Sequence, residues 1–335
     1  MRILILGGTV FLGRALVEAA LEREHEITLF NRGHTNPNLF PGIERLFGNR
    51  DSDLAELEGT HWDAVLDTSG YVPRIVRKSV KLLARQTDHY TFISSLSAYA
   101  DISQIGIEEN APLAKLADET TEEVTGDSYG PLKALCEREV IEAMTDRALI
   151  VRPGLIVGPF DPTDRFTYWP HRIARGGEIL APGRPDREIQ FIDVRDLAEW
   201  LIRMVEAQVP GIYNAVGPAA PLTMKQLLDD GRKMLNRYST LTWVDDEFLL
   251  KKHVDPWIDL PLWLPDSDIF SGGMLRASGR KALGAGLTFR SVEDTFLDTH
   301  KWEAKRPINH EWVAGLSIDR ENGLLRSWHL AQRDM

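Results

Sequence analysis

Two side chains, Tyr129 and Lys133, have the types and the spacing that proton transfer to an oxygen atom requires. They stand four residues apart in a segment whose pattern predicts a helix, so both fall on one helix face and can reach a common ligand. A lysine ammonium beside a phenol favours the phenolate and lowers a pKa that starts at about 10. Such a tyrosine can pass a proton to or from a carbonyl or hydroxyl oxygen at neutral pH.

A hydroxyl that could hold the same oxygen precedes this helix. Residues 89–95 predict a strand that ends in Ser94 and Ser95. A Y-x-x-x-K pair alone is common on exposed helices, but a preceding strand-end serine makes the set more specific. We therefore expect a hydroxyl of Ser94-Ser95, the Tyr129 phenol and the Lys133 ammonium to act on one oxygen atom.

A glycine turn at the start of the chain predicts what these residues work with. The apolar run 3–6 predicts a buried strand, glycines follow it, and a helical pattern begins at Arg14. Strand, glycine turn and helix in this order are typical of a dinucleotide site, with the pyrophosphate at the helix N-terminus. Val10 stands where the pattern has its middle glycine. The residues expected to bind the cofactor here are Gly7, Thr9, Phe11, Leu12 and Gly13.

The tip of the second predicted strand, 26–30, indicates which dinucleotide is bound. An NAD site usually has an acidic residue there for the ribose hydroxyls. This chain has Asn31 and Arg32, and a guanidinium suits a ribose 2′-phosphate. The pattern favours NADP over NAD, the alternative being an arginine in a solvated loop.

The elements that must position these residues alternate along the chain. Further strands are predicted at 43–51, 63–70 and 148–154, and helices after Pro73, from 129 to 142 and from 195 to 205. This alternation predicts an α/β fold, a Rossmann-type doubly wound parallel sheet. Thr68, Ser69 and Gly70 end the fourth strand, and these small residues are expected to lie against the cofactor.

Beyond residue 159 strands and helices no longer alternate regularly. Residues 189–194 and 212–216 are expected to return to the main sheet, so that 1–159 and 189–217 form the dinucleotide-binding domain. Residues 160–188 and 218–335 are expected to form a smaller, mostly helical cap that binds substrate. Its aromatic residues predict a pocket that excludes water, and the substrate contacts expected overall are Ser97, Tyr99, Tyr168, Trp169 and His171.

Composition narrows the possible partners. The 335 residues are 43% hydrophobic and 27% charged with a formal net charge of -11, so we expect no general binding of nucleic acid or of anionic membranes. The single cysteine, Cys136, and the absence of a signal-peptide pattern predict a cytoplasmic protein. The histidines lack metal-ligand spacing, so no metal is expected. The composition is also compatible with a homodimer.

Together these motifs resemble the short-chain dehydrogenase/reductase superfamily, in its extended, NAD-dependent epimerase/dehydratase-like branch. The likeness covers about residues 1–217 through GGTVFLG, ISSLSAY, YGPLK, RPGLIVGP and FIDVRDLA. The resemblance implies that Ser95 is the catalytic serine, that Tyr129 is the general acid/base, and that Lys133 lowers its pKa and holds the nicotinamide ribose. It also implies cofactor contacts at Asn49 and Arg50 near the adenine, at Pro153 near the nicotinamide, and at Ser94.

Departures from the family pattern bear on the reaction. Leu96 and Ser97 stand where the sugar dehydratases have an acidic pair. Leu155 and Ile189 stand where nucleotide-sugar epimerases have an asparagine and an arginine that grip the nucleotide. Four arginines could compensate for this loss, namely Arg165, Arg172, Arg184 and Arg187.

Three functions are compatible with these residues. The first is an NAD(P)-dependent oxidoreductase that moves hydride between nicotinamide and a carbonyl/alcohol pair of a small, partly apolar substrate. The second is an NAD-dependent sugar-nucleotide epimerase. The third is a non-catalytic, RNA-associated relative of the same fold, against which the acidic charge and the complete Ser/Tyr/Lys set both count.

Overall fold

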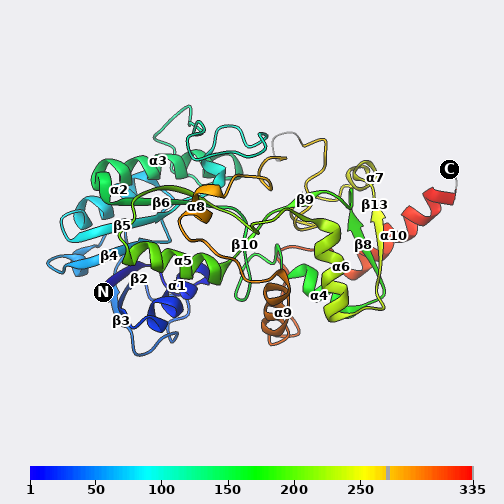
Figure 1. Cartoon of the computed structure of the whole chain (residues 1–335), viewed down its shortest axis with the longest axis horizontal. Coiled ribbons are helices and arrows are strands. Elements are labelled where there is room, and N and C mark those ends of the chain that lie inside the picture. The colour runs from blue at the N-terminus through cyan, green and yellow to red at the C-terminus, as the bar shows by residue number, and fades with distance from the viewer. Residues whose placement is uncertain (269–271, 334–335) are drawn as a thin grey trace.

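A seven-stranded parallel sheet forms the first part of the computed structural model, which describes residues 1–268 and 272–333 (Figure 1). The strands run in the order β11-β6-β5-β4-β1-β2-β3. Their bounds are β1 Arg2–Leu6, β2 Glu26–Asn31, β3 Glu44–Phe47, β4 Trp62–Asp67, β5 Thr87–Ile93, β6 Ala148–Pro153 and β11 Gly211–Ala215. The order reverses between β1 and β4, the switch point where ligands of open α/β sheets bind.

Helices cover both faces of this sheet, which explains why its strands are apolar throughout. In β1, Ile3 and Ile5 join one hydrophobic core and Leu4 and Leu6 join the other. Helices α1 (Phe11–Glu22) and α5 (Val194–Glu206) lie on one face, and α2 (Pro73–Leu83) and α3 (Gly126–Met144) lie on the other (Figure 1). The predicted doubly wound fold is confirmed.

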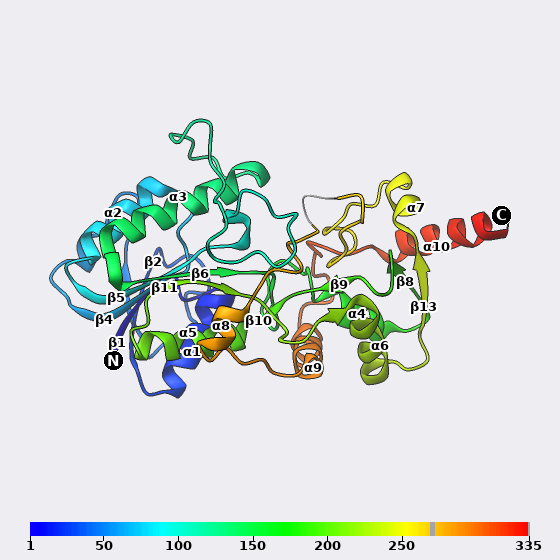
Figure 2. The same ribbon diagram turned by 45° about the horizontal axis from the view of Figure 1, so that its top comes forward.

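The C-terminal half packs around a hydrophobic core of its own, beside the sheet (Figure 2). Trp169 and Trp263 are fully buried in it. This half is mainly helical but also contains a parallel pair of strands, β8 with β13, which the sequence analysis did not predict. Its elements are α4 Tyr168–Arg175, β8 Glu178–Pro182, β12 Leu222–Thr223, α6 Met224–Leu235, β13 Thr240–Val244, α7 Asp246–Lys251, α9 Val292–Glu303 and α10 Ile318–Arg333.

The predicted return of 189–194 to the main sheet is wrong. β9 (Glu188–Ile189) pairs with β12, and β10 (Ile192–Asp193) pairs with β7 (Ile156–Val157), in separate two-stranded sheets. The outer edge of β6 is occupied by β11, and residues 188–193 pair with β12 and β7 instead. The remaining short elements are η1 Ala55–Leu57, η2 Leu96–Ala98, η3 Thr145–Arg147 and α8 Arg280–Gly284.

Helix α5 also joins the two halves through its N-terminus. The buried carboxylate of Asp193 accepts hydrogen bonds from the backbone N–H of Arg195 and from the Thr295 hydroxyl of α9. Arg290, just before α9, pairs with Asp196 at 2.7 Å. Among the helices described, none combines the length and apolar character needed to cross a membrane.

Candidate active site

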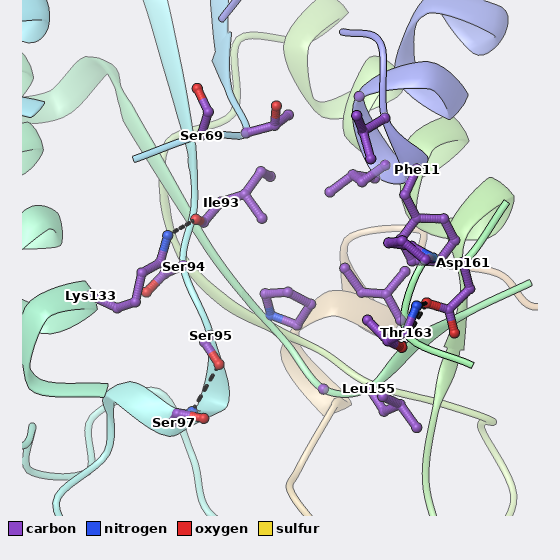
Figure 3. Close-up of a pocket in the computed structure, with 18 of the residues that line it drawn as sticks. Phe11, Ser69, Ile93, Ser94, Ser95, Ser97, Lys133, Leu155, Asp161 and Thr163 are labelled. Atoms are coloured by element: carbon purple, nitrogen blue, oxygen red, sulfur yellow. Dashed lines mark hydrogen bonds between the residues drawn. The ribbon is translucent and has the colours of Figure 1, made fainter. Parts of the chain in front are cut away.

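A cavity of about 620 Å³ lies at the carboxyl ends of the central strands (Figure 3). Phe11 and Leu155 lie on one side of it, and Ser94, Ser95 and Lys133 lie on the other. The predicted site residues that line it are Gly7, Phe11, Leu12, Gly13, Thr68, Ser69, Ser94, Ser95, Ser97, Tyr129, Lys133 and Pro153. Residues from five separate segments of the chain therefore meet at one cavity.

The glycine turn has the shape that an anion at a helix N-terminus requires. Gly7 and Gly8 have φ angles of +117° and +89°, which favour glycine, and a Cβ on Gly13 would lie 2.8 Å from the Gly8 nitrogen. Val10 is the N-cap of α1 and makes no side-chain cap, so the first N–H groups of the helix are left for a ligand. Its φ of -132° is ordinary extended backbone, which explains why valine is tolerated in place of glycine.

Lys133 is a buried cation that ties α3 to two strand ends. Its Nζ donates to the carbonyl oxygens of Gly70 and Ile93 at 2.7 and 2.5 Å, and it lies 4.3 Å from the Phe92 ring centre. Burial lowers the pKa of Lys133 to about 8. The ammonium lies in the wall of the cavity.

Tyr129 has a less acidic phenol than its spacing from Lys133 predicts. Burial raises the pKa of Tyr129 and outweighs the lowering effects of the Ser95 hydroxyl and the Arg165 charge. The physical reason is that the Lys133 ammonium donates to two backbone carbonyls instead. Ser95 itself is held by its Oγ, which accepts the Ser97 N–H at 3.1 Å (Figure 3).

Gly130 brings α3 close to the segment that carries Ser95. A Cβ at this position would lie 2.0 Å from the carbonyl oxygen of Ser97, inside van der Waals contact. Any larger residue would push Tyr129 away from Ser95. The glycine of YGPLK is thus a positioning residue that the sequence alone did not single out.

A buried polar network supports the end of β5 from below. The Ser94 hydroxyl donates to Glu137 at 2.5 Å, and Arg152 binds the same carboxylate through two nitrogens at 2.9 and 2.6 Å. Both Glu137 and Arg152 are nearly fully buried. The signal for this pair was an arginine inside an apolar strand, which requires a buried carboxylate partner.

Arg50 and Asn49 do not line the cavity, contrary to the expectation of an adenine contact. Arg50 donates to both carboxylate oxygens of Asp67 at 2.7 Å, and also to Ser79 and Ser69. These bonds use its terminal nitrogens beneath the cavity. The Asn49 side chain accepts the backbone N–H of Asp51 instead.

The second strand tip also differs in detail from its prediction. The Asn31 side chain donates to the Gly7 carbonyl at 3.0 Å and accepts the Gly33 N–H at 2.9 Å, so it braces the glycine turn. Thr9 is buried outside the cavity lining, and the Gly70 carbonyl is used by Lys133. Arg32 is exposed.

Four of the five predicted substrate residues lie away from the cavity, and only Ser97 lines it. The Tyr99 hydroxyl donates to Asn214 at 2.7 Å. Tyr168 and Trp169 are buried in the C-terminal core, where Trp169 donates to the Pro261 carbonyl. His171 pairs with Glu303 and lies against the Trp312 ring. Their aromatic character serves packing, so this part of the prediction is wrong.

The rest of the cavity wall is formed by residues of which the sequence had singled out only Arg165, as one of four arginines that could bind an anion. Asp161, Thr163 and Arg165 come from the loop after β7, and Trp257 and Met274 from the C-terminal half. Tyr71, whose ring centre lies 6.4 Å from that of Tyr129, completes this wall. Among the described residues, no group of three His, Cys, Asp or Glu side chains could hold a metal ion.

Comparison with known proteins gives a consistent family. Residues 3–215 match the "NAD dependent epimerase/dehydratase family". The chain is 24% identical to epimerase family protein SDR39U1 of Bos taurus, over 67% of this chain and 76% of that protein. It is 27% identical to 2-alkyl-3-oxoalkanoate reductase of Stenotrophomonas maltophilia (68% and 74% covered). It is also 23% identical to the chloroplast stem-loop binding protein of 41 kDa b of Arabidopsis thaliana (64% and 58%).

Solved structures share the fold. UDP-glucuronic acid 4-epimerase from Bacillus cereus, in complex with NAD, aligns with a TM-score of 0.66 at 14% identity, covering 91% of this chain and 99% of that one. A putative epimerase from Burkholderia cenocepacia J2315 aligns with the same TM-score at 18% identity, covering 90% and 98%.

Proposed function

Since the chain belongs to the NAD dependent epimerase/dehydratase family, we propose that it is an NAD(P)-dependent oxidoreductase. It transfers hydride between the nicotinamide and the carbonyl or alcohol carbon of a small, partly apolar substrate. The observation that carries this proposal is that Ser95, Tyr129 and Lys133 line one cavity together with the glycine turn.

In the proposed reduction, each side chain has a separate task. The hydroxyls of Ser95 and Tyr129 hydrogen-bond the carbonyl oxygen and fix its position. Tyr129 gives its proton to that oxygen as charge develops on it, and Lys133, which lines the same cavity, would hold the nicotinamide ribose. When bound, the nicotinamide supplies the hydride. In the reverse direction the phenolate takes the proton back.

The residues around the turn fit a dinucleotide without further change. A Cβ would fill the space at Gly13, and the N-terminus of α1 has no side-chain cap. We propose NADP as the preferred form, because Arg32 is exposed beside the turn and Asn31 leaves no carboxylate there to repel a 2′-phosphate.

Two observations favour an oxidoreductase over the epimerase alternative. Leu155, where the epimerase pattern has an asparagine, lines the cavity, and Ile189 is buried, so neither offers a polar grip on a nucleotide. The relative named as a reductase of 2-alkyl-3-oxoalkanoates acts, by that name, on a ketone. An RNA-binding role has one named relative in support, and the net charge of -11 opposes it.

The direct test replaces the phenol of Tyr129. We expect Tyr129→Phe to lower kcat for carbonyl reduction with NADPH by about 10²- to 10⁴-fold, since the proton donor is lost. Binding of NADPH, followed by its fluorescence, should change less than about twofold. Tyr238→Phe, at a tyrosine 79% exposed, is the control and should keep wild-type kcat. Full activity of Tyr129→Phe would overturn the mechanism, and NAD bound tightly to the purified protein would favour the epimerase.

A further inference from the structure

We propose that the substrate is an oxo acid whose carboxylate is bound by Arg165, an inference that rests on the proposed oxidoreductase function. Arg165 lies in the loop after β7 and lines the same cavity as Ser95 and Tyr129. It is thus a specificity-determining residue that selects substrates by charge.

Of the four arginines that could bind an anion, the other three are already paired. Arg172 lies 2.5 Å from Glu321, Arg184 lies 2.6 Å from Asp266, and Arg187 lies 2.6 Å from Asp246. Within residues 1–268 and 272–333, no carboxylate lies within 4 Å of the Arg165 guanidinium. Arg165 is the member of this set whose charge remains available to a ligand.

The guanidinium is held so that its terminal nitrogens stay available. Its Nε donates to the Thr163 hydroxyl at 3.1 Å, and that hydroxyl in turn donates to Asp161 at 2.7 Å. The Trp257 ring centre lies 5.9 Å from the guanidinium carbon. A carboxylate can therefore bind the two terminal nitrogens side by side, as arginine–carboxylate pairs commonly do.

The charges near Arg165 match one negative charge better than two. Asp161 is buried close by, and its Oδ2 has no hydrogen-bond partner. This acidic neighbour repels a phosphate dianion or a diphosphate more strongly than a carboxylate. Leu155, Met274 and Trp257 make the surrounding wall apolar, which fits the carbon chain of an oxo acid.

The position of Arg165 relative to Tyr129 sets the geometry of the substrate. Both side chains line one cavity of about 620 Å³, so the carboxylate and the reacting oxygen bind in the same site. In the reaction the ketone carbon gains a hydride from NADPH and its oxygen gains the Tyr129 proton. The products are a hydroxy acid, NADP and a tyrosine phenolate that takes a proton from water.

The test compares a 3-oxo acid with its methyl ester, in wild type and in Arg165→Met. We expect wild type to prefer the acid, and Arg165→Met to raise KM and Kd for the acid by about 10- to 100-fold, since charged hydrogen bonds are lost. Its values for the ester should not change. Arg165→Lys should fall between the two, and Arg184→Met should behave as wild type.

Binding is measured separately from turnover, by calorimetry with the protein–NADP complex. Equal binding of acid and ester would overturn the carboxylate site and leave the oxidoreductase proposal intact. Binding of the acid that depends on Arg165, without turnover of either compound, would overturn the proposed reaction only. An equal loss for acid and ester in Arg165→Met would show a structural role and overturn the inference, as would tighter binding of the matching phosphate.

Discussion

Lys133 and Cys136 are two buried ionisable side chains of α3 that burial affects in opposite ways. Burial lowers the pKa of Lys133 from 10.5 to about 8, and it raises the pKa of Cys136 to about 12. In each case the neutral form is favoured, since a charge is poorly solvated there. The two groups therefore make opposite contributions to the pH dependence of stability.

The sign for Lys133 follows from proton counting. Between about pH 8 and the ordinary lysine value of 10.5, the unfolded chain holds a proton that the folded chain has released. The contribution of Lys133 to the free energy of unfolding therefore rises with pH in this window, and is lost as pH falls through about 8. For Cys136 the folded pKa is raised, so its contribution falls once pH exceeds the ordinary thiol value of about 8.5.

We predict that wild type gains stability relative to Lys133→Met as pH rises through this window. Urea denaturation at about pH 7.5 and about pH 9.5 gives the two differences in unfolding free energy. Cys136→Ala is the companion variant, because wild type should lose stability relative to it over the same range. Parallel curves for wild type and Lys133→Met would contradict the lowered pKa.

Arg32 carries a prediction about the cofactor. We expect Arg32→Ala to weaken NADPH binding by about 10-fold or more, because a charged hydrogen bond to the 2′-phosphate is lost. NADH binding should change less than about twofold. Fluorescence titration with both forms measures this. Equal small effects would identify Arg32 as a surface charge only.

At the scale of single residues, the sequence predicted those parts of the site whose side chains follow a local pattern. Spacing and strand ends placed Ser95, Tyr129 and Lys133 at one cavity, and the structure brings them there. It could not predict that the Lys133 ammonium donates to the Gly70 and Ile93 carbonyls, because those contacts join segments distant in sequence. For the same reason the sequence named four candidate arginines but could not tell that Arg172, Arg184 and Arg187 are paired with carboxylates.

Among the elements, the loop after β3 is fixed to the sheet by one buried ion pair. Arg50 binds Asp67, whose side chain is fully buried at the end of β4 and also accepts the Tyr90 hydroxyl. Removing one partner leaves a buried charge without compensation. The position of the loop after β3 should therefore depend on the Arg50–Asp67 pair.

We predict that Arg50→Met lowers the free energy of unfolding by about 3 to 5 kcal/mol, measured by urea denaturation. Arg138→Met is the matched control, because its partner Glu119 and Arg138 itself are both about half exposed, and its effect should stay within about 1 kcal/mol. The double variant Arg50→Met/Asp67→Asn should regain part of the loss. Equal losses of unfolding free energy in Arg50→Met and Arg138→Met would show that burial of the Arg50–Asp67 pair contributes nothing.

The success of prediction also differs between elements. The central strands of the main sheet contain apolar runs between turn residues, and all seven strands were predicted close to their observed bounds. The two-residue strands β7, β9, β10 and β12 have no periodicity to read, because they are too short to alternate. Their pairing depends on which strand edges the larger sheet has already used.

At the scale of the whole molecule, the sheet half and the C-terminal half pack around separate hydrophobic cores. The sheet half follows the rules of parallel strands and covering helices, so its fold could be predicted from hydrophobic runs. The C-terminal half combines helices with the β8–β13 pair, which are 62 residues apart at Glu178 and Thr240, and their pairing leaves no local signal. Aromatic residues there were assigned to substrate because composition alone does not distinguish a pocket from a core.

The wall formed by Trp257 and Met274 has a consequence for how selectivity can change. Residues 3–215 match the family and contain Ser95, Tyr129 and Lys133, whereas these two wall residues lie outside that segment. Substitutions at Trp257 and Met274 can reshape this part of the cavity wall while Ser95, Tyr129 and Lys133 stay unchanged. Trp257 and Met274 are therefore natural starting positions for directed evolution, whereas Asp161, Thr163 and Arg165 of the same wall lie inside the family segment.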